Sequence, residues 1–263
     1  MLQFNGKLAL ITGAARGNGK AIAREYGGRG AQVVTTDILE DRLAQTTKEL
    51  NAAGIKAYGY PCELSDDASV KELRAKVIRD AGVTAILHNN AYSTFDAKTT
   101  DMAKAFDVSV LGYVRVIQAF LPEMTARMSG HIINTASPLG IVPPKQVANM
   151  MAYAIVKAGD ISLSQSIVVA LEPYNIGVTV LIPELIKTEA LDALRGKGNP
   201  EFESQFEAFI NLSATTPEDA APGMLDEVIK AKFIASQWAP FQDMLIVYTR
   251  NGMDPRNALP EQK

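Results

Sequence analysis

The chain has 263 residues, 47% of them hydrophobic and 21% charged, which is enough apolar material for a sizeable core. Its formal net charge of −3 leaves no basic excess to follow a phosphate backbone, so the composition argues against a nucleic-acid-binding protein. One cysteine, Cys62, cannot form an internal disulfide, and the two histidines are too few for a structural zinc site. The first strand-like run begins at Lys7, leaving no room for a signal peptide, and no uninterrupted apolar run reaches the length of a membrane span. We therefore expect a globular, cytoplasmic protein with no nucleic-acid or membrane partner.

Short runs rich in Val, Ile and Leu alternate with longer helical patterns, an order typical of βαβ units and a parallel sheet. In chain order, strands are expected at residues 7–12, 31–37, 55–61, 84–90, 131–137, 176–183 and 244–249. Helices are expected at residues 17–29, 41–54, from Ser65-Asp66-Asp67 onward, 101–128 and 149–173. No linker or change of composition separates these units, so we expect a single domain over residues 1–263.

The stretch 184–216 has a different texture, because it lacks a strand signal and carries several large apolar residues. These residues are Leu191, Leu194, Phe202, Phe206 and Phe209. A long insertion at the carboxyl end of a strand is more often a lid over a site than part of the core. We therefore interpret 184–216 as a substrate lid.

The stretch TGAARGNG, residues 12–19, follows the first expected strand and opens the first expected helix. Its three glycines allow a tight turn and let a pyrophosphate approach the helix N-terminus, where N–H groups and the helix dipole favour an anion. The spacing is G-x-x-x-G-x-G, which differs from the G-x-G-x-x-G of the usual dinucleotide fingerprint. The strand–turn–helix context still predicts a phosphate cradle, with a ligand-free glycine turn as the alternative. The cradle residues are Gly13, Arg16, Gly17, Asn18 and Gly19.

Asp37, followed by Ile38, ends the second expected strand, 18 residues after Gly19. A carboxylate at this position accepts hydrogen bonds from an adenosine ribose diol and repels a 2′-phosphate. Arg16 is a complication, because a guanidinium near this loop can meet a phosphate. The carboxylate carries more weight, so NAD is predicted in preference to NADP.

Tyr153 and Lys157 stand four positions apart in the expected helix 149–173. Both side chains would leave the same face, one turn apart. A phenol beside an ammonium is either a tuned proton donor or an ordinary pair on a half-buried helix. These two residues alone do not decide between the alternatives.

Taken in order, these motifs resemble the short-chain dehydrogenase/reductase family over nearly the whole chain, from Lys7 to about Gly252. The motifs are TGAARGNG, Asp37, Asn89-Asn90-Ala91, Ser137 after IINTA, Tyr153 with Lys157, and IPELIKT at 182–188. The resemblance implies an α/β Rossmann fold, with one doubly wound sheet of seven parallel strands and helices on both faces. It also implies NAD or NADP as cofactor and a homo-oligomer, a tetramer or a dimer.

The resemblance implies a catalytic role for Ser137, Tyr153 and Lys157. Tyr153 would exchange a proton with the substrate oxygen, although a free phenol is too weak an acid for this work at neutral pH. Lys157 would favour the phenolate, lower the pKa of Tyr153 and reach the nicotinamide ribose. Ser137 would hold the substrate oxygen against Tyr153 while a hydride passes between the nicotinamide and the substrate carbon.

The resemblance also implies the remaining cofactor contacts. Asn90 and Ala91 would lie along the adenosine-side ribose. Glu63 and Leu64 would lie against the adenine, with Glu where the family usually has Asp. The contacts expected at the nicotinamide end are Pro183, the backbone of Ile186, and Thr188.

Three positions near this site depart from the family pattern. Tyr92 replaces a glycine; it is strained if the backbone needs a positive φ, and otherwise its ring walls the substrate pocket, which we favour. Ser109 stands where an Asn usually holds a water in the proton relay behind the lysine. Glu184 replaces a glycine, and its carboxylate would stabilise the oxidised cofactor, contact substrate or point to water. The expected substrate pocket is lined by Tyr92, Leu139 and Glu184, with an enlarged loop at 143–145 at its mouth.

The leading hypothesis is an oxidoreductase that transfers a hydride between NAD(H) and a small or medium, apolar or cyclic, secondary alcohol or ketone. A lyase is disfavoured, because halohydrin dehalogenases lack the glycine loop and carry Arg in place of the lysine. A cofactor-binding sensor or scaffold without catalysis is kept open by Tyr92, Ser109 and Glu184. His88 lies within an apolar strand and is interpreted as a satisfied core residue.

Overall fold

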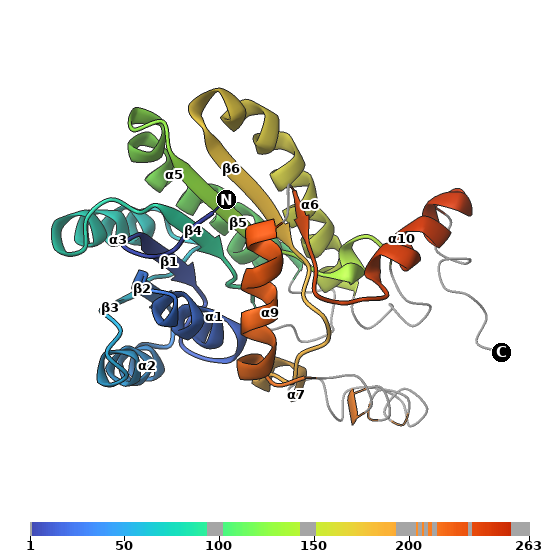
Figure 1. The fold of residues 1–263 in the computed structure, drawn as a ribbon, viewed down its shortest axis with the longest axis horizontal. Coiled ribbons are helices and arrows are strands. Elements are labelled where there is room, and N and C mark those ends of the chain that lie inside the picture. Colours follow the sequence, from blue (N-terminus) through green and yellow to red (C-terminus); the bar gives the residue numbers. More distant parts are fainter. Residues whose placement is uncertain are drawn as a thin grey trace.

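A parallel sheet forms the centre of the computed structural model, which describes residues 2–93, 102–142, 151–192, 204, 207, 210–211, 215–230 and 233–253 (Figure 1). Its seven strands run in the order β3-β2-β1-β4-β5-β6-β7, and each described pairing is parallel. The strands are β1 (Leu8–Thr12), β2 (Gln32–Asp37), β3 (Ala57–Pro61), β4 (Ile86–Asn89), β5 (Gly130–Thr135), β6 (Ile176–Leu181) and β7 (Ile234–Ala235). The predicted fold class is confirmed.

Helices cover both faces of this sheet (Figure 1). The α-helices are α1 (Gly17–Gly28), α2 (Glu40–Ala52), α3 (Asp67–Asp80), α4 (Met102–Phe106), α5 (Gly112–Ala126), α6 (Met151–Leu171), α7 (Glu189–Asp192), α9 (Pro217–Lys230) and α10 (Phe241–Arg250). The short helices of other types are the π-helical turn η2 (Asp107–Leu111) and the 3₁₀ helices η3 (Pro138–Gly140) and η5 (Glu172–Tyr174).

Each face of the sheet has its own hydrophobic core. Ala9 and Ile11 of β1 belong to the core shared with α1, α2 and α9, whereas Leu8 and Leu10 belong to the core shared with α3 and α5. Successive side chains of a strand point to opposite faces, so a strand buried on both sides reads as one continuous apolar run. This is why the first four residues of LALIT are apolar and all five are buried.

Two predicted elements differ from the structure. Residues 244–249, predicted as the seventh strand, lie in α10, and the seventh strand is the short β7. The run MLIVYT is apolar enough for a strand, but the buried side chains of α10, which are Phe241, Met244 and Tyr248, recur with a helical period. The helix predicted at 101–128 is interrupted by the π-helical turn η2, which the apolar periodicity does not reveal.

Two helical stretches in the described part of the chain, Met102–Ala126 and Met151–Tyr174, are long and apolar enough to cross a membrane by length and composition alone. Both stretches contain charged residues, so neither is an uninterrupted apolar run. Phe120 and Leu171 from these stretches lie in the core on one face of the sheet. We interpret both as core helices of the α/β fold.

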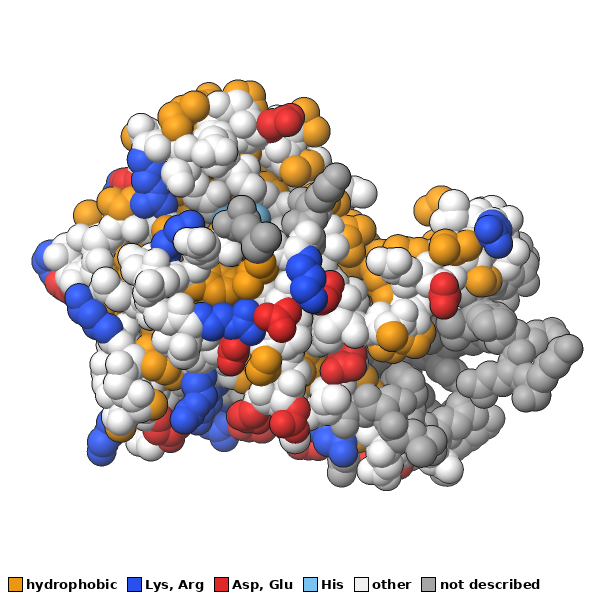
Figure 2. Space-filling view, in the orientation of Figure 1, with side chains coloured by type: hydrophobic (Ala, Val, Ile, Leu, Met, Phe, Trp, Pro, Cys, Tyr) orange, Lys and Arg blue, Asp and Glu red, His pale blue; other side chains and the backbone are white. Residues whose placement is uncertain are grey.

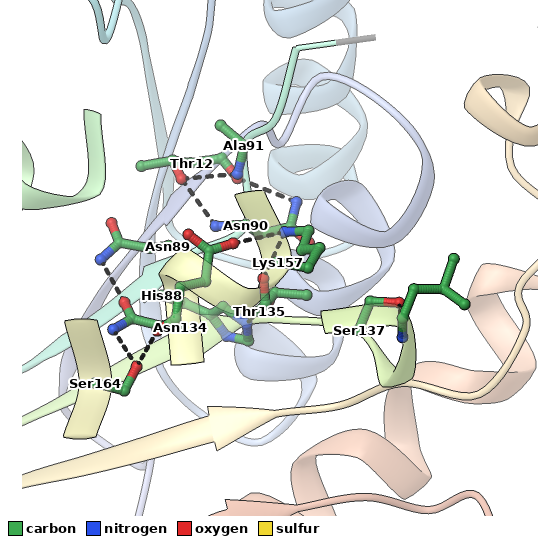
Figure 3. Close-up of polar contacts among 12 residues, drawn as sticks. Thr12, His88, Asn89, Asn90, Ala91, Asn134, Thr135, Ser137, Lys157 and Ser164 are labelled. Carbon is green, nitrogen blue, oxygen red and sulfur yellow. Dashed lines mark hydrogen bonds and ion pairs between the residues drawn. The ribbon is translucent and has the colours of Figure 1, made fainter. Parts of the chain in front are cut away.

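His88 is buried in β4 with both ring nitrogens paired, as the core interpretation predicts. Its Nδ1 lies 3.1 Å from the Tyr26 hydroxyl. Its Nε2 lies 3.0 Å from Thr135 Oγ1 (Figure 3). Burial, and then the charge of His131, lower the pKa of His88 from 6.5 to about 3. The imidazole is therefore neutral in the folded protein at neutral pH.

Acidification is expected to destabilise the fold through His88. Because its pKa is lower in the folded than in the unfolded protein, the stability it contributes is present above pH 6.5 and is lost as the pH falls towards 3. The loss from this residue should reach about 3 kcal/mol near pH 4.5. Urea unfolding near pH 7 and pH 4.5 measures it. His88→Gln should be less stable at both values but should lose less between them, and an equal loss would contradict the assignment.

Candidate active site

The glycine loop connects β1 to α1 at the carboxyl edge of the sheet, where the strand order reverses between β2 and β4. Gly13 has φ +67°, and a Cβ on it would lie 2.7 Å from the Cα of Ala91. A Cβ on Gly19 would lie 2.1 Å from the carbonyl oxygen of Gly13. Asn18 Oδ1 is buried without a hydrogen-bond partner among the described residues. Backbone packed this closely, at the N-terminus of a helix, fits a pyrophosphate.

Asp37 lies at the end of β2, beside this loop. Its Oδ2 accepts a hydrogen bond from the backbone N–H of Ala15 at 3.0 Å, and its Oδ1 accepts one from Leu39 N–H at 3.1 Å. Two backbone donors thus fix the carboxylate where it is expected to bind a ribose diol. The next residue, Ile38, is 58% exposed and lies open to a ligand there.

Arg16 is paired with a carboxylate from the other side of the site. Its Nη1 lies 2.8 Å from Glu189 Oε2, and Arg42 of α2 pairs with the same oxygen. Hydrogen bonds from Arg42 and Arg16 lower the pKa of Glu189. These side chains, with Lys20 and Lys187, line a cavity of about 390 Å³ next to Gly17. The positive charge of Arg16, which complicated the prediction of NAD, is therefore partly offset by Glu189.

Asn90 and Ala91 follow β4 and lie against the glycine loop (Figure 3). The Thr12 hydroxyl accepts hydrogen bonds from Asn90 N–H at 2.9 Å and Ala91 N–H at 3.1 Å. The Asn90 side-chain amide donates to the carbonyl oxygen of Thr12 at 3.2 Å. These bonds join the ends of β1 and β4, so Asn90 helps to fix the conformation of the glycine loop.

Tyr92 has no positive φ, so the interpretation of a strained residue is wrong. Its ring meets the ring of Tyr153 edge to face, with centroids 6.0 Å apart, and its hydroxyl is hydrogen-bonded to Thr188. Burial, and then the neighbouring Tyr153, raise the pKa of Tyr92 to about 12. This placement fits the favoured interpretation of a pocket wall, between α6 and the segment after β6.

Ser137 and Tyr153 come together where the turn after β5 packs on α6. Ser137 Oγ accepts a hydrogen bond from Leu139 N–H at 3.2 Å at the start of η3. A Cβ on Gly140 would lie 2.5 Å from the Lys157 backbone, so this turn lies directly on the helix. The side chains of Ser137 and Tyr153 are hydrogen-bonded to each other. The structure thus joins the two hydroxyls that the sequence placed 16 positions apart.

Lys157 differs from expectation in what it contacts. Its Nζ donates to the carbonyl oxygen of Thr135 at 2.7 Å and to Asp160 Oδ2 at 2.9 Å (Figure 3). The expected lowering of the Tyr153 pKa is not found: burial raises it to about 12, the hydrogen bond with Ser137 lowers it, and the charge of Asp160 raises it. Burial is the main cause of the raised pKa, and the carboxylate of Asp160, which is paired with Lys157, adds to it.

Asp160 is the site residue that the sequence reasoning missed. It is fully buried in α6, and burial outweighs the pairing with Lys157 and raises its pKa to about 6. A signal was present in the sequence, because Lys157 and Asp160 are the only charged residues between Met151 and Leu171. An acid three positions after a lysine on an otherwise apolar helix predicts a buried ion pair.

Ser109, the expected relay residue, lies in the π-helical turn η2. It is buried, and its hydroxyl has no hydrogen-bond partner in the part of the chain that the structure describes. It therefore makes no direct bond to Lys157. Its role in a relay stays a prediction.

The segment after β6 forms the far wall of the site. Glu184 Oε1 accepts a hydrogen bond from Thr215 Oγ1 at 3.1 Å, a partner that none of the three interpretations of Glu184 included. Next to it, buried Pro183 leads to Ile186, which forms a parallel bridge with Thr215. The Thr188 side chain lies 3.5 Å from where a Cβ on Gly17 would be. Much of the proposed lid, including 193–203, and the pocket-mouth loop 143–145 lie outside the described residues.

The two residues expected against the adenine lie in the turn after β3. Glu63 Oε1 accepts hydrogen bonds from the backbone and the hydroxyl of Ser65, at 3.0 and 2.8 Å. Leu64 is 3% exposed and packs in the core with α3 and α5. The structure therefore gives Glu63 a local role in the turn and leaves Leu64 mainly a core residue.

The chain is similar to known proteins over most of its length. A family model described as short chain dehydrogenase matches residues 7–198. The chain is 28% identical over 268 residues to the oxidoreductase UcpA of Salmonella typhimurium, covering 99% of this chain and 98% of that protein. A short-chain dehydrogenase/reductase from Burkholderia phymatum, crystallised with NAD, matches its structure with a TM-score of 0.84 and 25% identity over 100% of both chains.

A second structural neighbour carries the other nicotinamide cofactor. A metagenomic short-chain oxidoreductase in complex with NADP matches with a TM-score of 0.70 and 27% identity, over 89% of this chain and 96% of that one. The matched region includes the glycine loop, Ser137, Tyr153 and Lys157. With its parallel seven-stranded sheet, the chain belongs to the short-chain dehydrogenase/reductase family of oxidoreductases.

Proposed function

We propose that the protein transfers a hydride between NAD(H) and a secondary alcohol or ketone of small to medium size, apolar or cyclic in character. The observation that carries this proposal is the hydrogen-bonded pair of Ser137 and Tyr153 at the same sheet edge as the glycine cradle. Tyr92 and the partly exposed Leu139 favour an apolar substrate surface.

In this proposal the chain positions its reactants and moves one proton. The nicotinamide, when bound, supplies or accepts the hydride. Tyr153 donates a proton to the ketone oxygen, or accepts one from the alcohol, while Ser137 holds that oxygen with a hydrogen bond. Gly13, Gly17 and the N-terminus of α1 would hold the pyrophosphate, and Thr188 would face the nicotinamide end.

We further infer that NAD is preferred to NADP, because the Asp37 carboxylate, held at the end of β2 by two backbone N–H groups, would repel a 2′-phosphate. Titration followed by nicotinamide fluorescence should give a Kd for NADH at least about tenfold below that for NADPH. Asp37→Ser should reduce this ratio, whereas the exposed control Asp80→Asn should leave it unchanged. Tighter binding of NADPH would reverse the assignment, and binding of neither cofactor would reject the proposed function.

A second candidate is a cofactor-binding sensor without catalysis. The pairing of Lys157 with Asp160, together with the raised pKa of Tyr153, favours it, because a phenol that resists ionisation is a poor base at neutral pH. A panel of secondary alcohols with NAD, and of ketones with NADH, separates the two candidates. Binding of NADH without turnover of any member would favour the sensor.

We also infer a cytoplasmic homo-oligomer, a tetramer or a dimer. Large apolar side chains are exposed on α6 and on η2, which packs against it. Met151 and Ile155 of α6 and Leu111 of η2 are each more than 40% exposed. Hydrophobic side chains also lie along α10, which extends away from the sheet (Figures 1 and 2). Light scattering coupled to size exclusion tests the inference, and a monomer would contradict it.

A further inference from the structure

The ion pair between Lys157 and Asp160 is closed off from water. Lys157 is 2% exposed and Asp160 is 0% exposed, and the two side chains lie one turn apart on α6. The ammonium lies between two oxygens, at 2.7 Å from the carbonyl of Thr135 and 2.9 Å from Asp160 Oδ2. A buried lysine held by a carboxylate and a strand carbonyl has little freedom to change its position.

Three tyrosine rings surround the same ammonium. Lys157 Nζ lies 5.7 Å from the ring centroid of Tyr92, 5.9 Å from that of Tyr113 and 5.8 Å from that of Tyr153. These rings come from the segment after β4, from α5 and from α6. The cation thus lies within about 6 Å of the centroids of three phenol rings, and of the three only Tyr153 has Ser137 as a partner.

Several polar atoms behind this pair are buried without a hydrogen-bond partner in the described residues. They are Asp160 Oδ1, the Tyr113 hydroxyl and Ser109 Oγ. Burial, and then the charge of Asp160, raise the pKa of Tyr113 well above 10, so the carboxylate and this phenol act on each other. Leaving such groups buried and unpaired costs free energy, and this is typical of functional sites.

We propose that Asp160 is a positioning residue for the reaction: it fixes the Lys157 ammonium and offsets its charge at Tyr153. The proposal deepens the proposed function and rests on it. A lysine alone would stabilise the phenolate strongly. With the carboxylate in place, the negative charge of Asp160 opposes the effect of the ammonium at the phenol, so the pKa of Tyr153 depends on both residues.

The proposal predicts how the rate of alcohol oxidation depends on pH, through the pKa of Tyr153. The groups facing Tyr153 are Lys157 and Asp160 on its own helix, Tyr113 from α5, Tyr92 after β4 and Ser137 after β5. Of these, Asp160 carries the negative charge that opposes the phenolate. Removing that charge should lower the pKa of Tyr153, and the base form needed for alcohol oxidation should then form at lower pH.

The test is Asp160→Asn, which keeps the shape of the side chain and removes its charge. The acid limb of kcat/KM for alcohol oxidation should move to lower pH by about one unit or more, with KM for NAD unchanged within about twofold. The matched control is Asp226→Asn, which removes an exposed carboxylate paired with Arg29, 2.7 Å away, far from the site. An unmoved limb, or an equal shift in the control, would overturn the proposal.

A readout without turnover separates this proposal from the proposed function. With 13Cζ-labelled tyrosine, the Tyr153 resonance is identified by its loss in Tyr153→Phe. In the unaltered protein, this resonance should move with a midpoint near pH 6, where the pKa of Asp160 lies. A response near pH 6 in an inactive protein would support the proposal while rejecting the dehydrogenase. No response between about pH 5 and 7 would reject it even if Asp160→Asn did not fold.

Discussion

Tyr153→Phe is expected to lower kcat for alcohol oxidation by about a thousandfold or more, while the Kd for NADH changes by less than about twofold. The change removes the one hydroxyl that is hydrogen-bonded to Ser137 and leaves the ring in contact with Tyr92. Packing therefore stays nearly constant while the proton path is lost. Steady-state rates and a fluorescence titration with NADH measure the two effects separately.

The control for this change is Tyr174→Phe, which removes a phenol hydroxyl from η5, where the side chain is 43% exposed. It should leave both kcat and NADH affinity unchanged. Survival of activity in Tyr153→Phe would mean that another group exchanges the proton. A comparable loss of NADH affinity in that variant would instead point to a binding role for the hydroxyl.

Gly13→Ala is expected to abolish NADH binding and to lower the free energy of unfolding by about 3 kcal/mol. The new methyl group would lie 2.7 Å from the Cα of Ala91, and the backbone at φ +67° disfavours any side chain. Because the methyl group would meet the backbone Cα and N of Ala91, at 2.7 and 3.0 Å, the loop and the 90–92 segment must move apart. That movement opens the cradle that would hold the pyrophosphate.

Gly54→Ala is the matched control, because Gly54 has φ +81° but no atom lies within 4 Å of its added Cβ. Only backbone strain is introduced there, which should cost about 1–2 kcal/mol and leave NADH affinity intact. Urea unfolding and NADH titration of both variants separate strain from steric contact. Equal destabilisation and unchanged binding in Gly13→Ala would show that the loop is not the cofactor cradle.

The sequence predicted the elements whose pattern reflects local and sheet constraints. TGAARGNG could be placed between a strand and a helix because glycines and an apolar run define that turn, and α1 begins at Gly17 as expected. Tyr153 and Lys157 could be assigned to one helix face from their spacing. Six strands were located within a few residues for the same reason: each is a short apolar run between turn signals.

The misplaced elements depend on interactions that no single stretch of sequence contains. The run 244–249 is apolar in either state, and its packing against Ala136 and Ile182 determines that it is a helix. The partner of Lys157 was not predicted, because Asp160 belongs to none of the motifs. Its need for a counter-charge arises only when α6 packs on η2 and β5. Tyr92 could not be assigned from the sequence either. Its backbone φ value, which only the structure gives, excludes a strained residue and leaves a pocket wall.

The bridge between Ile186 and Thr215 has a consequence for how such a protein can change over generations. Lys187 N–H donates to Thr215 O at 2.8 Å and Thr215 N–H donates to Leu185 O at 3.1 Å, so the chain is pinned at both positions before α9 begins. Doubling the length of a segment with fixed ends costs only about 0.6 kcal/mol in closure entropy. We therefore expect changes of length between these anchor points to cost little, except at Thr188 and Glu189, which contact Gly17 and Arg16 of the glycine loop. If the proposed function is correct, substrate preference would diversify in this segment while the glycine loop and the pair of Ser137 and Tyr153 are kept.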